Sequence, residues 1–202
     1  MLRVDGSRWL EEIVGDMVLS YHIATVPHVR NEGRPRVQSL VIDFGATSGN
    51  LVSVMKAVHR PATLGDVNRL FELRRQSITK LATKGMSFAD AASWAEKLTI
   101  PDMEKKIREL EIWVAEVNGA VVGWGAMRGD RLEGLYTEPD FAGRGIGTGL
   151  LSLIEVLMRG RGIPALRAEA SSNAVTFYFR RGYERSGPCT SDGAQPIKKR
   201  LL

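Results

Sequence analysis

The sequence has little of what secreted, membrane or fibrous proteins need. Its 202 residues include one cysteine, Cys189, so an internal disulfide is excluded. No apolar run approaches the roughly 18 residues of a membrane-spanning helix, because the best candidate, residues 150–158, contains Glu155. The first residues lack the charged head and apolar core of a signal peptide. These absences predict a soluble protein of the reducing cytoplasm.

Strong charge of one sign and clusters of metal ligands are also missing. Lys and Arg number 28 and Asp and Glu 23, and the resulting charge of +5 suits an anionic ligand but is too diffuse to indicate nucleic acid. The histidines His22, His28 and His59 show no metal-ligand or hydrolase spacing. Neither a histidine nor a nucleophile elbow accompanies Cys189. We therefore expect no metal, no nucleic acid and no membrane among the partners.

The composition that remains, 44% hydrophobic and 25% charged, is typical of an ordinary folded domain. In the middle of the sequence it predicts three short strands in succession. The first is rich in β-branched and aromatic residues and ends at Asn118-Gly119. A type I′ hairpin turn needs positive φ at both central residues, which this pair tolerates at least cost. The expected strands are residues 112–117, 120–126 and 131–137.

Helical periodicity flanks this meander on both sides. Before it, the sequence predicts a short edge strand over 54–58 and helices over 66–81, 87–94 and 102–110, the second opened by a capping box at 87–90. After it, the sequence predicts a buried helix over 150–158, a parallel strand over 164–170, a helix over 174–181 capped by Ser171 or Ser172 and closed by Gly182, and a strand over 196–202.

Residues 1–54 differ in character from the rest and form a small appendage. Trp9, Leu10, Ile13, Val14 and Met17 have the spacing of one helix face, and residues 37–44 are typical of a strand. Glycine and proline separate the two. An alternative stays open, in which Met55 is the biological start and residues 1–54 are translated upstream sequence.

Four glycines at every second position, in residues 143–149, follow the third strand and open the apolar helix. Such a turn is an anion site, because unpaired backbone N–H groups and the helix dipole converge where glycine lets a phosphate approach. The dinucleotide pattern G-x-G-x-x-G fails, because its last position holds Thr148, Leu150 or Ser152. The Gly-Lys-Ser/Thr of a nucleoside-triphosphate loop is absent as well.

Residues 135–151, LYTEPDFAGRGIGTGLL, resemble instead the acyl-CoA motif of the GNAT superfamily of N-acetyltransferases. The family pattern is Gln/Arg-x-x-Gly-x-Gly/Ala after a strand, and counting from Pro139 places its glycines on Gly145 and Gly147. Ala142 then stands where Gln or Arg is usual, which is a departure. A shifted register on Arg144 also fits the letters, but it lengthens the loop and shortens the helix. In either register the backbone amides of residues 143–149 would hold the pyrophosphate.

A second segment, residues 171–183, is similar to the late motif of the same family. Aligned on Gly182-Tyr183, the family's Ala falls on Ala174 and its Tyr on Tyr178, while its Asn position holds Ser171. The two segments occur in the family's order. Together with the order of the elements they extend the resemblance over roughly residues 55–202, which we expect to form one acetyltransferase domain.

The resemblance implies an α/β (α+β) fold with a mixed, mostly antiparallel central sheet of about six to seven strands and helices on both faces. It implies acetyl-CoA as cosubstrate and no metal. The family pairs the pantetheine arm with the end of the strand before the Gly-rich turn. The residues expected to bind acetyl-CoA are Leu135, Tyr136, Thr137, Ala142, Gly143, Arg144, Gly145, Ile146, Gly147, Thr148, Ser171, Ala174 and Tyr178.

Acyl transfer from a thioester to an amine needs a neutral amine, a polarised carbonyl and a stabilised thiolate. The resemblance assigns Tyr178 to the departing sulfur. Glu133, in the strand that leads to the acyl site, is the first candidate for the base, and Glu169 on the neighbouring strand is the second. For each carboxylate a strand-edge salt bridge is an equally good interpretation.

The first hypothesis is a bacterial, cytoplasmic acetyl-CoA-dependent N-acetyltransferase that acylates a primary amine by direct attack in a ternary complex. The amine of a small molecule is the favoured acceptor, and a protein or peptide amine stays open as the alternative. The competing hypothesis is a catalytically inactive acyl-CoA sensor or partner module, motivated by the departures at Ala142 and Ser171. Family members often dimerise through their last strands, so a homodimer is possible. The sequence does not name the acceptor.

Overall fold

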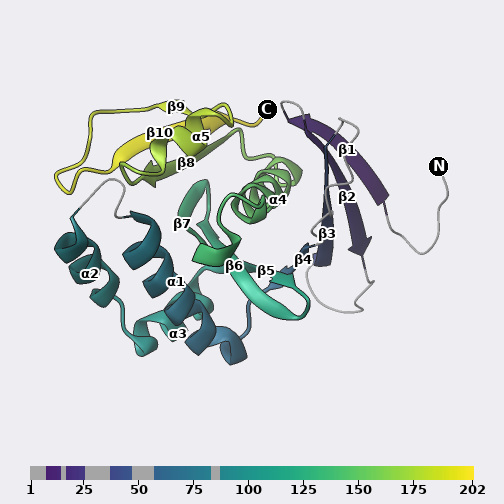
Figure 1. Cartoon of the computed structure of the whole chain (residues 1–202). Coiled ribbons are helices and arrows are strands. Elements are labelled where there is room, and N and C mark those ends of the chain that lie inside the picture. The colour runs from purple at the N-terminus through teal and green to yellow at the C-terminus, as the bar shows by residue number, and fades with distance from the viewer. Residues whose placement is uncertain (1–7, 15–16, 26–36, 47–56, 83–86) are drawn as a thin grey trace.

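One sheet of ten strands runs through the residues that the structure, a computed structural model, describes (Figure 1). These are the backbone of residues 8–14, 17–25 and 37–46, and backbone and side chains of residues 57–82 and 87–202. The sheet order is β1-β2-β3-β4-β5-β6-β7-β8-β10-β9, in which β7 and β8 are parallel and every other pair is antiparallel. The strands are β1 (Arg8–Val14), β2 (Met17–Thr25), β3 (Val37–Ala46), β4 (Ala57–Pro61), β5 (Glu111–Val117), β6 (Ala120–Arg128), β7 (Arg131–Thr137), β8 (Ala165–Ala170), β9 (Glu184–Arg185) and β10 (Gln195–Arg200).

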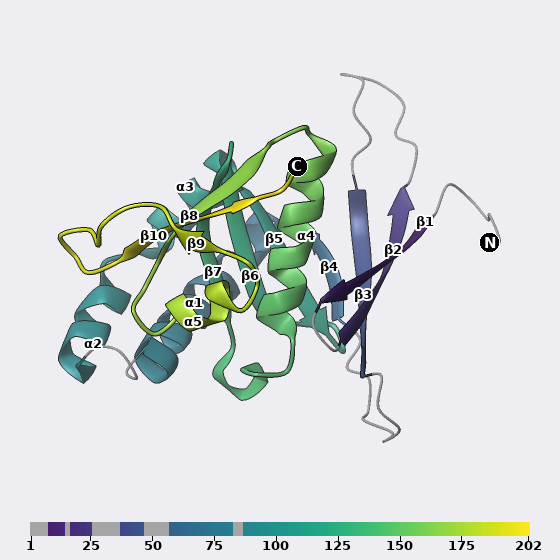
Figure 2. The same cartoon turned by 90° about the horizontal axis from the view of Figure 1, so that it is seen from above.

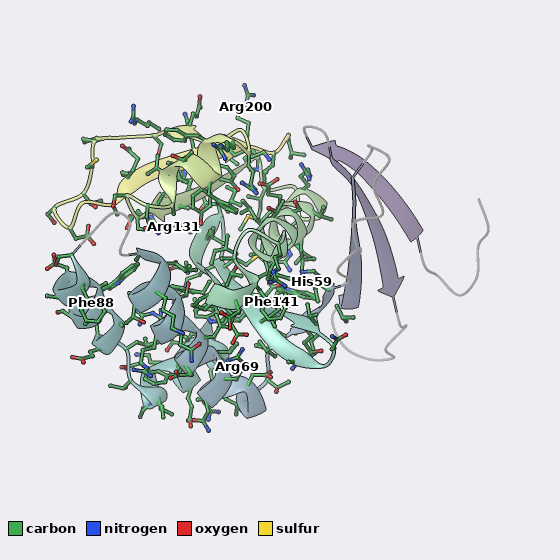
Figure 3. The ribbon with its side chains drawn as sticks, viewed as in Figure 1. His59, Arg69, Phe88, Arg131, Phe141 and Arg200 are labelled. Atoms are coloured by element: carbon green, nitrogen blue, oxygen red, sulfur yellow. The ribbon has the colours of Figure 1, made fainter. Side chains whose placement is uncertain are left out.

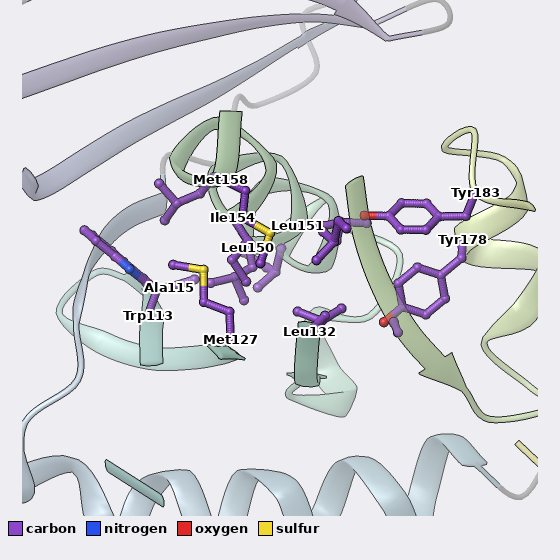
Figure 4. Close-up of a cluster of buried hydrophobic side chains, with 14 of the residues drawn as sticks. Trp113, Ala115, Met127, Leu132, Leu150, Leu151, Ile154, Met158, Tyr178 and Tyr183 are labelled. Carbon is purple, nitrogen blue, oxygen red and sulfur yellow. The ribbon is translucent and has the colours of Figure 1, made fainter. Parts of the chain in front are cut away.

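Helices cover both faces of the part of the sheet formed by β4 to β10. The helices α1 (Val67–Leu81), α2 (Phe88–Glu96) and α3 (Ile100–Glu109) lie on one face, and α4 (Ile146–Gly160) lies on the other with α5 (Val175–Phe179) beside it (Figure 2). Alternate residues of β5 follow this division: Val114 packs with α1, whereas Trp113 packs with α4 (Figure 4). The predicted fold class is confirmed.

The strands and helices with clear local signals form where they are predicted. Asn118 has φ of 52° and Gly119 of 77°, as a type I′ turn requires. Ser87 caps α2 by accepting a hydrogen bond from the amide of Asp90. The strand β8 runs parallel to β7 after the α4 crossover. None of the helices in the described parts of the chain is long and apolar enough to cross a membrane.

The N-terminal prediction of a helix is wrong. The backbone forms β1 and β2, which pair along the whole of β1, from Arg8 opposite Ile23 to Val14 opposite Met17. An apolar pattern this short fits a helix face and a strand equally, so pairing with the neighbouring strand decides. The predicted edge strand over 54–58 is also corrected: β4 begins at Ala57 and lies between β3 and β5. The hypothesis of a start at Met55 falls on a residue outside the described ones.

Three helix starts differ from the sequence-based expectation. The helix α4 starts at Ile146 rather than at residue 150, with Gly145 as its N-cap. The helix α3 starts at Ile100, because Thr99 rather than a later residue forms a capping box with Asp102. The helix α5 has Ala174 as N-cap with no side-chain cap, because Ser171 Oγ is hydrogen-bonded to Asn173 Oδ1 instead, 2.8 Å away.

Candidate active site

The sheet opens at the end of β7. Its parallel pairing with β8 covers only Arg131 opposite Arg167 and Leu132 opposite Ala168, and beyond this point β7 pairs with β6 alone. Leu132 is opposite Met127 and Gly134 is opposite Ala126, so Glu133 is the extra residue of a bulge. A bulge bends its strand away from the regular ladder. Backbone groups on the β8 side of residues 133–137 thus lie outside the sheet pairing.

The Gly-rich turn follows directly, so that the N-terminus of α4 lies at this opening. A short 3-10 helix, η3 (Pro139–Phe141), leads into the turn, and Figure 3 places Phe141 at the base of α4. Gly143 has φ of 75° and Gly145 of 89°, in the left-handed region that favours glycine. The glycines are needed here because the chain reverses from β7 into α4 within a few residues.

The backbone amides of this turn are mostly unpaired. Arg144 donates to the carbonyl of Phe141 at 3.3 Å, and Gly149 donates to that of Gly145 at 2.9 Å. In the described residues no acceptor faces the remaining amides, which are those of Gly143, Gly145, Ile146, Gly147 and Thr148. Unpaired N–H groups at a helix N-terminus bind phosphate oxygens. The residues present therefore fit the pyrophosphate of coenzyme A.

Glycine at position 147 lets the first turn of α4 approach its neighbours closely, because no side chain lies between them. A Cβ added there would lie 3.4 Å from Thr137 Oγ1 and 3.7 Å from the Phe177 ring. The turn thus packs against the end of β7 and against α5, the two other segments that the sequence assigns to the site. Ala142 is exposed and has no polar side chain to offer, and Arg144 is exposed with its guanidinium 5.7 Å from the Phe141 ring.

Tyr178 lies on α5 and is 7% exposed, with its ring 5.4 Å from that of Tyr183 (Figure 4). Its hydroxyl has no hydrogen-bond partner among the described residues. The hydroxyl oxygen is not fully enclosed by the protein, so it keeps some access to solvent. Burial, with a smaller contribution from nearby Tyr136, raises the pKa of Tyr178 well above its usual value. Tyr178 is thus a protonated phenol with a free donor at neutral pH.

The two candidate bases differ in their surroundings. Glu133 is exposed at the bulge and forms no ion pair with any residue in the described ranges. Glu169 accepts a hydrogen bond from Arg131 at 2.9 Å. This is the strand-edge salt bridge that the sequence allows as the alternative to a catalytic role. In the described residues no group of three or more His, Cys, Asp or Glu is placed to hold a metal ion.

The segment before α5 connects the site to α1. Ser171 and Ala174 lie just before α5, Tyr178 lies on it, and Ser171 is half-buried. Asn173 Nδ2, which lies beside the assigned Ser171, donates to the carbonyl of Leu81 at 3.4 Å. This contact joins the end of α1 to the loop between β8 and α5, so that α1 forms one side of the same region.

Two arginines at the site have partners that the sequence does not indicate. Arg69 on α1 donates to the carbonyl of Val121 at 2.8 Å and pairs with Glu138, the residue that joins β7 to the turn. Arg181 donates to the hydroxyl of Thr148 in the first turn of α4 and stacks 3.7 Å from the centre of the Phe177 ring. The Nε of Arg181 is enclosed without a partner in the described residues.

Burial lowers the pKa of Arg181 from its usual value. Its guanidinium lies beside a helix N-terminus, which is also positive. The guanidinium of Arg181 and the N-terminus of α4 together attract an anion to this part of the site. Both arginines meet partners that are far away in the sequence, so only the fold reveals their positions.

Comparison with known proteins identifies the family. A profile described as the acetyltransferase (GNAT) domain matches residues 78–195, more than half of the chain. The chain is 24% identical over 120 residues to the uncharacterized N-acetyltransferase YafP of Escherichia coli (strain K12), which covers 59% of this chain and 76% of that protein.

Solved structures show the same fold. A GCN5-related N-acetyltransferase from Rhodopseudomonas palustris has a TM-score of 0.69 and 26% identity, covering 75% of this chain and 99% of that one. The PaiA N-acetyltransferase from Thermoplasma acidophilum, in complex with coenzyme A, has a TM-score of 0.62 and 22% identity, covering 71% and 98%. The family match includes β7, the Gly-rich turn, α4 and α5. The chain belongs to the GNAT family and is an N-acetyltransferase.

Proposed function

We propose that the acyl donor is acetyl-CoA and that the acceptor is a primary amine of a small molecule, attacked directly in a ternary complex. The observation that carries the proposal is the set of unpaired amides between Gly143 and Thr148, at the place where β7 and β8 part. These amides would hold the pyrophosphate, and the free edge at residues 135–137 would hold the pantetheine arm and thioester.

In the proposed reaction the amine nitrogen attacks the thioester carbonyl carbon, so that a C–N bond forms and the C–S bond breaks. Glu133, directly or through water, takes the proton that the amine loses. A backbone N–H of residues 135–137 polarises the carbonyl oxygen. Tyr178 gives its proton to the departing sulfur, for which a protonated phenol with a free hydroxyl is suited. No covalent intermediate with the protein is needed.

The alternative of an inactive acyl-CoA sensor rests on Ala142 and Ser171, where the family's side chains are absent. The pyrophosphate contacts proposed here come from backbone amides, so an alanine at 142 removes one side-chain contact only. The free hydroxyl of Tyr178 favours the enzyme over the sensor.

The test is thermal unfolding of the full chain with and without acetyl-CoA, together with thiol release against a panel of amines. A ligand of the native state raises the midpoint by mass action. Cys189 is a free, exposed thiol, so release is followed over many turnovers and the signal of this thiol is subtracted. A higher midpoint with thiol release supports the enzyme, and a higher midpoint without release across the panel supports the sensor. No rise at saturating acetyl-CoA would refute the assignment of the Gly-rich turn.

We also propose that residues 55–202 form the acetyltransferase domain of a cytoplasmic protein, that residues 1–54 are an appendage to it, and that two copies associate. Mass spectrometry of the native protein tests whether residues 1–54 belong to it, because an intact peptide starting near Met1 excludes a start at Met55. Light scattering of the purified chain gives the mass in solution, and a monomer mass at assay concentrations would contradict the dimer.

A further inference from the structure

Arg74 is a buried cation on α1 without an acidic partner among the described residues. It is 7% exposed, and its guanidinium donates to the carbonyls of Ala95 at 3.1 Å and Trp94 at 3.3 Å, at the end of α2. No carboxylate in the described ranges pairs with it. Buried charges in proteins are normally paired, because removing an ion from water is costly.

Most of the hydrogen-bonding capacity of Arg74 is unused. A guanidinium carries five N–H donors, and only two bonds are formed with described residues. The Nε of Arg74 bonds none of them, yet it is not one of the fully enclosed, unbonded atoms, so it keeps access to solvent. The two bonds to α2 account for a role in packing, and the remaining donors are left for a ligand.

Two aromatic rings flank this guanidinium. Its Cζ lies 5.9 Å from the centre of the Trp94 ring and 5.8 Å from that of Tyr136. Aromatic faces stabilise a cation partly, but they do not neutralise its charge. The Tyr136 ring in turn packs against Trp124 with the ring centres 4.6 Å apart, which fixes its position.

The position of Tyr136 connects Arg74 to the reaction. Tyr136 lies on β7, between Leu135 and Thr137, in the segment proposed to hold the thioester. Its side chain packs with α1 and α2, whereas Leu135 packs on the opposite face with α4. Arg74 therefore lies next to the acyl site, on the face of the sheet away from the turn proposed for coenzyme A. An acceptor that approaches from the α1 and α2 side would meet Arg74 beside the acyl carbon.

We propose that Arg74 binds a carboxylate of the acceptor, so that the substrate is an amino acid or a similar amine that carries an acid group. This inference rests on the proposed function. The planar fork of a guanidinium matches the two oxygens of a carboxylate, and such an acceptor would neutralise the charge that the described residues leave unpaired. A di- or polyamine would instead bring a second positive charge toward Arg74 and would be disfavoured.

The experiment compares free amino acids with their α-amides, which differ in the carboxylate. Binding is measured by thermal unfolding of the full chain saturated with coenzyme A, and turnover is measured with acetyl-CoA. The α-amino group of an amino acid amide is less basic than that of the free amino acid, so more of it is neutral at a given pH. Intrinsic reactivity therefore favours the amides. We expect the opposite order, with at least one acid binding about tenfold or more tighter than its amide, as a charged hydrogen-bonded pair would give.

The matched variants are Arg74→Gln and Arg75→Gln. Both remove one positive charge from α1, but Arg75 is exposed and paired with Glu72. Arg74→Gln should abolish the preference for acids over amides, and Arg75→Gln should keep it. The comparison of acids and amides in the unaltered protein stands even if Arg74→Gln does not fold.

Equal binding of acids and amides, or tighter binding of amides or diamines, would overturn the inference while acetyl-CoA binding remains intact. A preference for acids that Arg74→Gln leaves unchanged would overturn it too. Absence of any stabilisation by coenzyme A and acetyl-CoA would instead refute the proposed function. The two failures are therefore distinguishable.

Discussion

Replacing Tyr178 by phenylalanine separates catalysis from folding. The phenylalanine ring fills the same space in the buried cluster, and the hydroxyl that is lost has no hydrogen-bond partner among the described residues. The free energy of unfolding should therefore change by less than about 1 kcal/mol. A general acid contributes roughly 10²- to 10⁴-fold to a rate. We expect kcat to fall at least about 100-fold, with the affinity for acetyl-CoA nearly unchanged.

Tyr183→Phe is the matched control, because Tyr183 belongs to the same cluster and packs against Tyr178. Its hydroxyl donates to the buried carboxylate of Glu155 at 2.9 Å, and the second oxygen of that carboxylate accepts from Lys199 at 2.7 Å. Losing a hydrogen bond to a charged group costs about 1.5–3 kcal/mol. The midpoint of thermal unfolding should fall by roughly 3–12 °C in a chain of this size, while kcat stays near that of the unaltered protein.

The assay is steady-state thiol release with both substrates varied, paired with thermal unfolding of each variant. Turnover of Tyr178→Phe equal to that of the parent would remove Tyr178 from the mechanism. A loss of turnover that is matched by a similar fall in the unfolding midpoint would show a structural role instead. An equal loss of kcat in Tyr183→Phe would refute the assignment of separate roles to the two tyrosines.

Four further predictions concern the base, the pH dependence expected of Tyr178, the Gly-rich turn and the loss of stability at acid pH. Glu133→Gln should lower turnover most at low pH, where amine deprotonation is limiting, and a loss independent of pH would indicate structure. Turnover should show no loss due to Tyr178 up to its usual pKa of 10.0, since burial raises the pKa, and a pH–rate profile checks this. Gly145→Ala should cost about 1–2 kcal/mol of stability, because φ is 89° there, and should weaken acetyl-CoA binding; thermal unfolding measures both. Hydrogen bonds from Arg60, above all, lower the pKa of Asp66 from 3.8 to about 2, which stabilises the fold above pH 3.8 and is lost as the pH falls toward 2. Asp66→Asn should cost about 2 kcal/mol at neutral pH and remove that acid dependence in urea unfolding.

Local chemistry let the sequence predict much of the fold. The Asn118-Gly119 turn, the cap at Ser87 and the glycines before α4 are set by the φ angles and hydrogen bonds that neighbouring residues allow. The sequence alone therefore predicts a turn whose backbone amides are left unpaired at a helix N-terminus. The resemblance to the acyl-CoA motif, rather than these local signals, predicted Gly145 and Gly147 as site residues, and the range matched by the family profile contains both glycines.

Competing contacts decided what periodicity and capping preference left open. The backbone of residues 8–14 is a strand because it pairs with β2, although its apolar spacing also fits a helix. Helix α5 begins without a serine cap because Ser171 bonds Asn173 instead. In both cases a tertiary or competing contact outweighs a weak local preference.

The charged neighbours of the site needed the tertiary structure most. Arg69 and Glu138 are 69 positions apart, and Arg181 and Thr148 are 33 apart, so no spacing rule connects them. Arg74 fits the helical periodicity of α1, and its sequence position does not show that it is buried near Trp94 and Tyr136 with no acidic partner in the described part of the chain. The sequence by itself predicted a Gly-rich anion site at the start of a helix, because the chemistry of such a turn is local. Only the fold determined the partners of Arg69, Arg74 and Arg181, because it brings helices and strands from distant segments together.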